Sequence, residues 1–311
     1  MNAPVRVSVV MPVFNAARTV AASIRSALDS QLRDLEVVVV DDGSSDASAD
    51  IVASLADTRV RLIRQAPSGG ASRPRNVGIA SARAPYIHFL DADDLLRPDK
   101  LSASLRALEQ HPEAGFAFGE FEHIDAEGKV LEAAVVGDKM TECALVRAPL
   151  AEGWSLITQP ELARGFLYRN FISPSGVTVR KSVLAAVGGF DESLVYSEDL
   201  DLWFRLAHHS SALYRDAVGH AYRVAPGSLT HRPSVRTYRD RITVLQRERA
   251  RRPSRAERRQ LDHLLAETQA TMGWEYRRSH RRLHAAAAFA RALVRQPRAR
   301  FARAFFSSLV P

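Results

Sequence analysis

The nine residues from Tyr86 to Asp94 read YIHFLDADD. Tyr86 to Leu90 have the mostly apolar character of a buried strand, and Asp91, Asp93 and Asp94 follow them directly. Three carboxylates this close repel one another unless a cation or hydrogen-bond donors lie among them, and hard divalent cations take oxygen ligands of this kind. The alternative interpretation is a solvated acidic turn that caps the next helix.

The composition is that of an ordinary soluble protein. The chain has 311 residues, of which 46% are hydrophobic and 25% charged, enough for one large domain with an appendage or for two modest domains. The single cysteine, Cys143, excludes an intrachain disulfide and fits a reducing compartment. The apolar run from Val5 to Phe14 is short and carries Arg6, so it predicts a first strand and not a signal peptide. No run is long enough to span a bilayer, so any membrane association is expected to be peripheral.

Charge is distributed unevenly along the chain. Residues 232–311 contain 20 arginines against 6 acidic residues, a net charge of +14, while the rest carries 23 basic and 29 acidic residues, a net charge of −6. An acidic body followed by a basic tail predicts a domain boundary near residue 231.

Short strand-like runs alternate with helical patterns through the first part of the chain. Leu35 to Val40, for example, is a continuous apolar run of the kind found in parallel strands buried on both faces. The predicted strands are 5–13, 35–40, 59–63 and 84–90, and the predicted helices are 17–30, 47–55, 71–82 and 99–110. This alternation predicts an α/β fold with an open, mostly parallel sheet flanked by helices.

Polar clusters occur at the carboxyl ends of three predicted strands. Pro12 to Asn15 follow the first strand, Asp41 to Asp46 the second, and Asp91 to Asp94 the fourth. Ligands of open α/β sheets bind beyond these strand ends, so we expect the three loops to converge on one rim. Taken alone, Asp41 and Asp42 are equally consistent with turn and capping roles, and Asp46 is expected to cap the next helix.

The joint order of these motifs resembles that of family 2 glycosyltransferases with the GT-A fold. Each motif alone is weak, but their order over residues 7 to 230 is specific. The resemblance implies a GT-A catalytic domain over residues 1–231 and a basic α-helical extension over 232–311. It is carried by Pro12–Asn15, Asp41–Asp46, Gly69–Gly70, Arg75–Ile79, Asp91–Asp94, Val187–Glu192, Ser197–Arg205 and Tyr222–Ser228.

The resemblance also implies a donor site. Nucleotide-sugar binding would fall to Pro12, Phe14, Asp42, Arg75 and Asp91, with Pro12 and Asp42 at the base and Asp91 at the ribose. Asp93, the second aspartate of the DxD pair, would hold Mn²⁺ or Mg²⁺ against the diphosphate. Such a cation stabilises the charge that develops on the departing nucleoside diphosphate.

The acceptor side is implied by the motif from Ser197 to Arg205. Asp199 matches the catalytic base of an inverting single displacement, which would deprotonate the acceptor hydroxyl. Glu198 and Trp203 are expected on the acceptor side. Their alternative roles are a first-turn acid favoured by the helix dipole for Glu198 and a core side chain for Trp203.

Two positions depart from the family pattern. Pro74 precedes Arg75 where many relatives have a small residue, which puts the geometry of that loop in doubt. Ala225 stands where many relatives have a histidine, so any metal or phosphate contact made by that histidine is absent.

Helical patterns return after His231. The predicted helices are 238–249, 255–270, 272–295 and 298–309, with breaks at Pro253 and Pro297. Apolar side chains recur four residues apart at Phe289 and Leu293, and again at Phe301, Phe305 and Leu309. Either these stripes pack inside the protein, or they bring the arginines against anionic lipid, which predicts peripheral membrane contact through residues 240–311.

These expectations describe a cytoplasmic enzyme, peripheral at the inner face of the membrane. It would move a sugar from a nucleoside-diphosphate donor, with UDP as the default, to a glycan or lipid-linked acceptor in polysaccharide biosynthesis. The absence of G-x-G-x-x-G and G-x-x-x-x-G-K-[ST] argues against an NAD or P-loop enzyme. The alternatives are a relative that only binds nucleotide sugar and a nucleic-acid-binding protein that uses the basic tail, but no nucleic-acid motif accompanies that tail.

Overall fold

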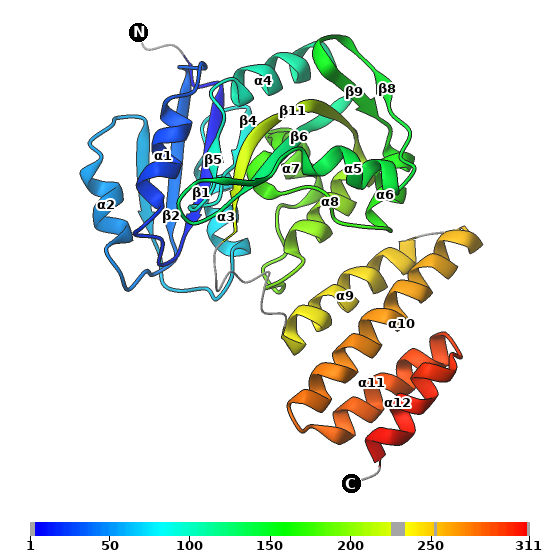
Figure 1. The fold of residues 1–311 in the computed structure, drawn as a ribbon. Coiled ribbons are helices and arrows are strands. Elements are labelled where there is room, and N and C mark those ends of the chain that lie inside the picture. The colour runs from blue at the N-terminus through cyan, green and yellow to red at the C-terminus, as the bar shows by residue number, and fades with distance from the viewer. Residues whose placement is uncertain (1–3, 225–233, 252–253, 310–311) are drawn as a thin grey trace. The chain divides into compact units, whose positions relative to one another are not determined.

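The computed structural model describes residues 4–224, 234–251 and 254–309 (Figure 1). The chain divides into two compact units: unit 1 is Met1–Glu192 with Asp201–Ala225, and unit 2 is Ser193–Leu200 with Pro226–Pro311. Three predictions from the sequence concern residues that the structure does not describe. They are the boundary at residue 231, the motif from Ala225 to Ser228 and the break at Pro253.

Unit 1 is built on one mixed sheet with the strand order β3-β2-β1-β4-β10-β6-β11-β9-β8, where β5 also pairs with β11 and β7 with β6. The pairs β1–β2, β2–β3 and β1–β4 are parallel, as the sequence predicts, and so is β6–β11. β10 is antiparallel to both β4 and β6. The strands are β1 (Val7–Val13), β2 (Leu35–Asp41), β3 (Val60–Arg64), β4 (Tyr86–Phe89), β5 (Leu95–Leu96), β6 (Ala114–Ile124), β7 (Val130–Glu132), β8 (Ala148–Pro149), β9 (Trp154–Ile157), β10 (Thr178–Arg180) and β11 (Ser211–Arg223).

Helices cover both faces of this sheet because alternate residues of each strand point to opposite sides. Val9 and Met11 of β1 share a core with Ile24 of α1 (Val20–Leu28) and with residues of α2 (Ser48–Ser54) and α4 (Lys100–Gln110). On the other face, Val10 packs against α3 (Ser72–Ser81) so closely that a Cβ at Gly78 would lie 2.4 Å from its Cγ1. The remaining helices are α5 (Val135–Glu142), η1 (Ala151–Gly153), α6 (Gln159–Phe166), η2 (Pro174–Gly176), α7 (Lys181–Val187) and α8 (Glu198–His209).

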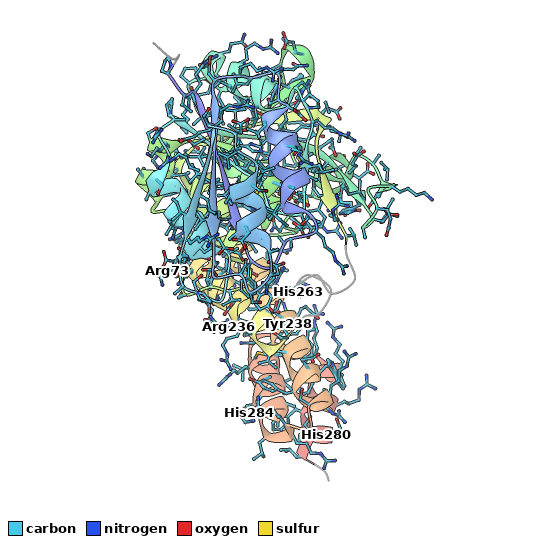
Figure 2. The ribbon with its side chains drawn as sticks, turned by 90° about the vertical axis from the view of Figure 1, so that its left-hand side faces the viewer. Arg73, Arg236, Tyr238, His263, His280 and His284 are labelled. Atoms are coloured by element: carbon cyan, nitrogen blue, oxygen red, sulfur yellow. The ribbon has the colours of Figure 1, made fainter. Side chains whose placement is uncertain are left out.

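Unit 2 contains the helices α9 (Val235–Arg251), α10 (Arg255–Arg278), α11 (Arg282–Arg295) and α12 (Ala299–Leu309). The predicted division into helices 255–270 and 272–295 is wrong, because α10 continues to Arg278 and α11 begins only at Arg282. Gly273 does not end the helix. It makes room for Phe289, whose ring atoms would lie 2.9 Å from a Cβ at that position. The chain turns at His280, with a left-handed φ of 56°, before His284 in the first turn of α11 (Figure 2).

The predicted apolar stripes of unit 2 face its own core for the most part. Phe289 and Phe301 are buried, Leu293 and Phe305 pack against the same cluster, and Leu309 alone of the five is more than half exposed. Packing inside the protein therefore accounts for four of these side chains. Among the described residues, no helix combines the length and the apolar character needed to cross a membrane.

Candidate active site

The loops after β1 and β2 are bound to each other at the carboxyl end of the sheet. Asn15, with a left-handed φ of 51°, donates its N–H to Ser44 Oγ (3.0 Å) and accepts from the N–H of Ser45 (2.9 Å). Asp46 accepts from the N–H groups of Ala17 and Ser48, both at 3.0 Å. Because Ser48 is the first residue of α2, Asp46 has a structural role close to the predicted cap.

Asp42 holds the loop that leads to α3. Its side chain is buried and accepts hydrogen bonds from Gln65 Nε2 (2.6 Å), Ser68 N (3.0 Å) and Ser68 Oγ (2.9 Å). Its own N–H donates to the carbonyl of Val13 at the end of β1 (2.8 Å). Asp42 thereby ties the segment at Gly69–Gly70 to the rim, while its contact with a nucleotide base stays a prediction.

Arg75 connects α3 to the acidic loop after β4. This side chain is 3% exposed and donates to Asp91 Oδ1 at 2.7 Å, and its guanidinium carbon lies 5.1 Å from the centre of the Phe190 ring. Pro74 occupies the first turn of α3, where a proline replaces an N–H that has no helical partner, so this departure leaves the helix intact. The ion pair joins two of the predicted donor residues.

Asn76 connects α3 to the segment Val187–Glu192. Its Oδ1 accepts from the N–H of Phe190 and its Nδ2 donates to the carbonyl of the same residue, both at 2.9 Å. Gly189 adopts a φ of 67°, and a Cβ there would lie 2.8 Å from Asn76 Oδ1. Two motifs more than 100 residues apart in the sequence thus meet beside Arg75.

The three carboxylates of the acidic loop have different environments. Asp94 is 1% exposed and accepts from Ser175 Oγ (2.5 Å) and the N–H of Arg223 (2.9 Å), while Ser175 Oγ accepts from the N–H of Asp91 (3.0 Å). Burial, with the neighbouring carboxylates adding to it, raises the pKa of Asp94 well above its usual range. Asp94 is therefore a structural anchor of the loop.

Asp93 remains accessible to solvent, and its carbonyl accepts from Arg223 Nε at 2.9 Å. Desolvation by the surrounding loops, together with the Asp91 carboxylate, raises the pKa of Asp93 to about 6, although the side chain keeps an exposed edge. No group of three or more His, Cys, Asp or Glu that could hold a metal is found in the described part of the chain. Asp91 and Asp93 have carboxylate oxygens of the kind that hard divalent cations take, and metal binding by them stays a prediction.

Pro12 and Phe14 mark the end of β1 at this rim. Pro12 pairs in register with Val40 of β2, and Phe14 follows the strand with 58% of its side chain exposed. An exposed aromatic ring at the carboxyl edge of a parallel sheet is available to a ligand. Its contact with the donor stays a prediction.

A buried basic cluster was missed by the sequence reasoning. Lys100 is 1% exposed and His220 fully buried, and neither Lys100 Nζ nor the ring nitrogens of His220 have a hydrogen-bond partner in the part of the chain that the structure describes. Burial, and then the Arg215 charge, lower the pKa of Lys100 to about 7. The third member, His88, binds Thr178 Oγ1 (2.9 Å) and the carbonyl of Ser175 (3.1 Å). No local pattern distinguishes Lys100 from an exposed first-turn lysine.

Asp199 lies in the first turn of α8, and its Oδ1 accepts from the N–H of Leu200 at 2.7 Å. Glu198 precedes it and is half-buried. Both residues belong to unit 2, whereas the predicted donor residues belong to unit 1. The meeting of Asp199 and Asp93 around one ligand stays a prediction. Trp203 is fully buried, which agrees with the alternative interpretation of a core side chain.

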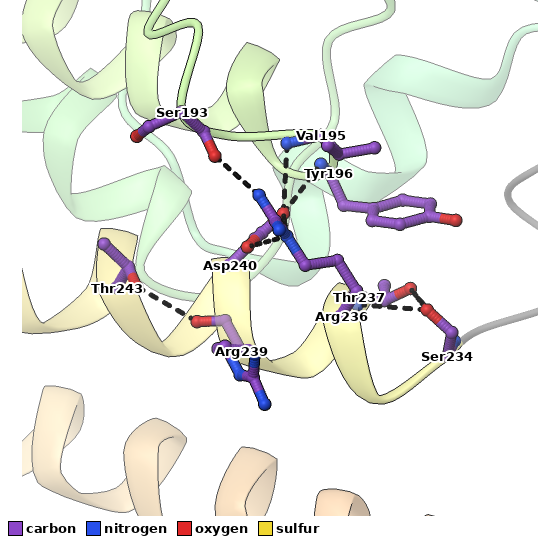
Figure 3. Close-up of polar contacts among 9 residues, drawn as sticks. All are labelled: Ser193, Val195, Tyr196, Ser234, Arg236, Thr237, Arg239, Asp240 and Thr243. Carbon is purple, nitrogen blue, oxygen red and sulfur yellow. Dashed lines mark hydrogen bonds and ion pairs between the residues drawn. The ribbon is translucent and has the colours of Figure 1, made fainter. Parts of the chain in front are cut away.

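The turn before Asp199 is bound by α9, an arrangement that sequence reasoning also missed (Figure 3). Asp240 Oδ2 accepts from the N–H groups of Val195 (3.0 Å) and Tyr196 (3.2 Å). Arg236 pairs with Asp240 and donates to the carbonyl of Ser193 at 2.6 Å. The sequence signal was weak, because Asp240 is one of two acids in an arginine-rich helix and Glu248 is the other.

Comparison with known proteins tests the resemblance. Residues 8–137 match the family model described as "Glycosyl transferase family 2". This part of the chain therefore belongs to glycosyl transferase family 2. This family 2 region contains β1 to β4, the acidic loop and the Arg75–Asp91 ion pair, so the predicted family is confirmed.

The relatives of this chain include a succinoglycan biosynthesis protein and a glycosyltransferase. The chain is 32% identical over 227 residues to the "Succinoglycan biosynthesis protein ExoO" of Rhizobium meliloti, covering 72% of this chain and 62% of that protein. It is 30% identical over 121 residues to the "Glycosyltransferase GlyG" of Streptococcus pneumoniae, covering 38% and 40%. The chain thus spans less than two thirds of the length of these relatives.

Solved structures confirm the fold class. The structure of S. aureus TarS 1-349 in complex with UDP matches with a TM-score of 0.64 and 20% identity, covering 94% of this chain and 81% of that one. Another structure of the same protein contains UDP-GlcNAc. At this identity the likeness establishes the GT-A fold with its helical C-terminal region. UDP and UDP-GlcNAc are ligands of TarS, and the likeness does not extend them to this chain.

Proposed function

We propose that the protein transfers a sugar from a nucleoside-diphosphate donor to a hydroxyl group of a glycan or lipid-linked acceptor. The observation that carries the proposal is the Arg75–Asp91 ion pair beside the exposed Asp93, at the carboxyl rim of the family 2 region. The UDP and UDP-GlcNAc complexes of TarS support a UDP-sugar as donor, and the succinoglycan relative supports a role in polysaccharide biosynthesis.

The donor side of the mechanism uses residues of unit 1. Asp93 would hold Mn²⁺ or Mg²⁺ with help from Asp91, and the cation would neutralise the diphosphate as it departs. Arg75 fixes the Asp91 carboxylate through a 2.7 Å bond, so the loop is oriented before the donor arrives. Pro12, Phe14 and Asp42 would contact the base end of the nucleotide.

The acceptor side uses Asp199. Its carboxylate would take the proton of the acceptor hydroxyl while the oxygen attacks the anomeric carbon, and the sugar–phosphate bond would break on the opposite face. The product is a glycoside of inverted configuration and a nucleoside diphosphate. Glu198 would lie beside the acceptor, and the buried Trp203 would support the helix from within.

The donor proposal predicts the result of a thermal-shift screen of nucleotide sugars with and without Mn²⁺. A UDP-sugar at 100 times its Kd should stabilise the parent protein by about 2.7 kcal/mol, which is roughly 5 °C in Tm. Asp93→Ala should lose the Mn²⁺-dependent part of this shift, because the remaining carboxylates are paired or buried. Asp50→Ala is the matched control, since Asp50 is an 83% exposed acid of unit 1 on α2. An Asp93→Ala protein with an unchanged Mn²⁺-dependent shift would show that the acidic loop is only structural.

We also propose that α11 and α12 contact the surface of a membrane. Residues 277–309 contain nine arginines and no acidic residue. Leu283, Ala287, Ala290 and Val294 lie at i, i+4, i+7 and i+11, which is one face of α11, and Leu283 and Val294 are 79% and 85% exposed. Phe306 is 63% exposed on α12. This exposed apolar surface among arginines fits an anionic bilayer at the cytoplasmic face of a membrane.

Vesicle flotation tests this surface. The full chain should float with vesicles that contain anionic phosphatidylglycerol. The double substitution Leu283→Asn with Val294→Asn should weaken binding about 30-fold, because burial of each side chain contributes on the order of 1 kcal/mol. The control pair is Leu131→Asn with Val146→Asn, which are 58% and 66% exposed in unit 1. Equal flotation of all three proteins would refute the assignment. So would binding of RNA that depends on the arginines and not on Leu283 and Val294.

A further inference from the structure

The turn that leads into α8 has a strained backbone. Ser197, two residues before Asp199, has a φ of 58°. A residue with a side chain occupies this left-handed region at a cost, and it persists when the surrounding structure holds it. Strain at the entry to the helix that carries the proposed base calls for a residue that maintains the turn.

Asp240 of α9 has the geometry to maintain it. Its carboxylate is 4% exposed and accepts the N–H groups of two successive residues, Val195 and Tyr196, at 3.0 and 3.2 Å. A charged acceptor makes stronger hydrogen bonds than a neutral one, and in a buried setting these bonds are expensive to break. Arg236 pairs with the same carboxylate and donates to the carbonyl of Ser193. Both the N–H groups and a carbonyl group of the turn are therefore hydrogen-bonded to α9.

A positive charge on α9 also lies near Asp199. Arg241 is next to Asp240 on α9, and its guanidinium lies within electrostatic range of the Asp199 carboxylate. Burial lowers the pKa of Arg241, and Asp199 acts in the opposite direction.

We infer that α9 is a positioning element for the proposed base, in which Asp240 fixes the turn from Val195 to Ser197 that leads to Asp199. The basic C-terminal helices then have a role in the reaction besides any contact with a membrane. The inference rests on the proposed function, because Asp199 is the base only if the protein is a transferase. All of these contacts lie within unit 2.

The first test measures hydrogen exchange and needs no activity. In Asp240→Asn, the N–H groups of Val195 and Tyr196 should exchange at least tenfold faster than in the parent protein, because a neutral amide replaces the charged acceptor. Asp262→Asn is the matched control, since Asp262 is a partly exposed acid of the same unit that pairs instead with Arg249 and Arg295. Unchanged exchange at Val195 and Tyr196 in Asp240→Asn would overturn the inference.

The second test separates positioning from stability. Asp240→Asn should lower kcat at least tenfold without changing the Kd of the UDP-sugar, and Asp240→Glu should recover part of the loss because it keeps the carboxylate. Asp262→Asn should leave kcat unchanged. Faster exchange with an unchanged kcat would overturn the positioning role and leave Asp240 a stabilising residue only. If the parent protein transfers no sugar from any donor, the proposed function fails, whereas the exchange result still tests the contact.

Discussion

Replacement of Asp199 with asparagine is expected to lower the rate of sugar transfer by about 10²- to 10⁴-fold. The amide has nearly the same shape as the carboxylate but cannot take the proton from the acceptor hydroxyl, so the barrier of the chemical step rises. Donor binding should stay the same, because the predicted donor residues Asp42, Arg75 and Asp91 belong to unit 1. The measurements are the rate of release of the nucleoside diphosphate with acceptor in excess and the Kd of the donor.

Glu198→Gln provides the control for this variant. Glu198 precedes Asp199 in the first turn of α8 and is also an acid, so a general loss of negative charge at the helix start would affect both variants alike. Because Glu198 would lie beside the acceptor without taking its proton, we expect Glu198→Gln to raise the KM of the acceptor and to retain most of kcat. An Asp199→Asn protein that keeps most of its turnover would remove Asp199 from the role of base, and the sequence motif would then describe a helix start only.

Replacement of Lys100 with methionine is expected to stabilise unit 1 by about 4 kcal/mol at pH 7.5 and by only about 1 kcal/mol at pH 10. The cause is the burial of the ammonium group, which lowers the pKa of Lys100 from 10.5 to about 7. Methionine has a similar volume and no charge to desolvate. Urea-induced unfolding of the parent and the variant at the two pH values gives the comparison.

The direction of the pH effect follows from proton binding in the two states. Between pH 7 and 10.5 the unfolded chain holds the Lys100 proton and the folded protein does not, so this residue makes stability rise with pH in that window. The charged and titratable groups that face Lys100 are Asp99 before α4, Arg215 and His220 of β11, and His88 of β4. Below pH 7 the full penalty is present. Above about pH 10.5 it disappears.

Lys129→Met is the control for the buried lysine, because Lys129 lies exposed in the turn between β6 and β7. Its unfolding free energy should differ from that of the parent by less than about 0.5 kcal/mol at both pH values. If Lys100→Met proved less stable than the parent at pH 7.5, an ordered water or ion would have to satisfy the ammonium group. Lys100 would then stabilise the folded protein.

Much of the donor rim could be predicted from the sequence because its signals are local. The run from Leu35 to Val40 and the aspartates that follow it place the end of β2 at Asp41 without reference to any other segment. The predicted helix 272–295 was wrong, because α10 continues through residue 271 to Arg278 and the chain then turns before α11. No glycine or proline marks the turn at His280, so local composition does not predict where α10 ends.

The sequence by itself determined the α/β order, the family and the identity of the acidic loop, since strand period, helix period and motif order are properties of contiguous residues. Only the tertiary structure decided that Asp94 turns inward to Ser175, that Asp91 pairs with Arg75 and that Asp93 remains exposed. The same holds for Asp240, which binds the turn before Asp199 across more than 40 residues of chain. The direction and protonation of a charged side chain depend on the donors and the burial supplied by distant segments, and the fold is what brings those segments together.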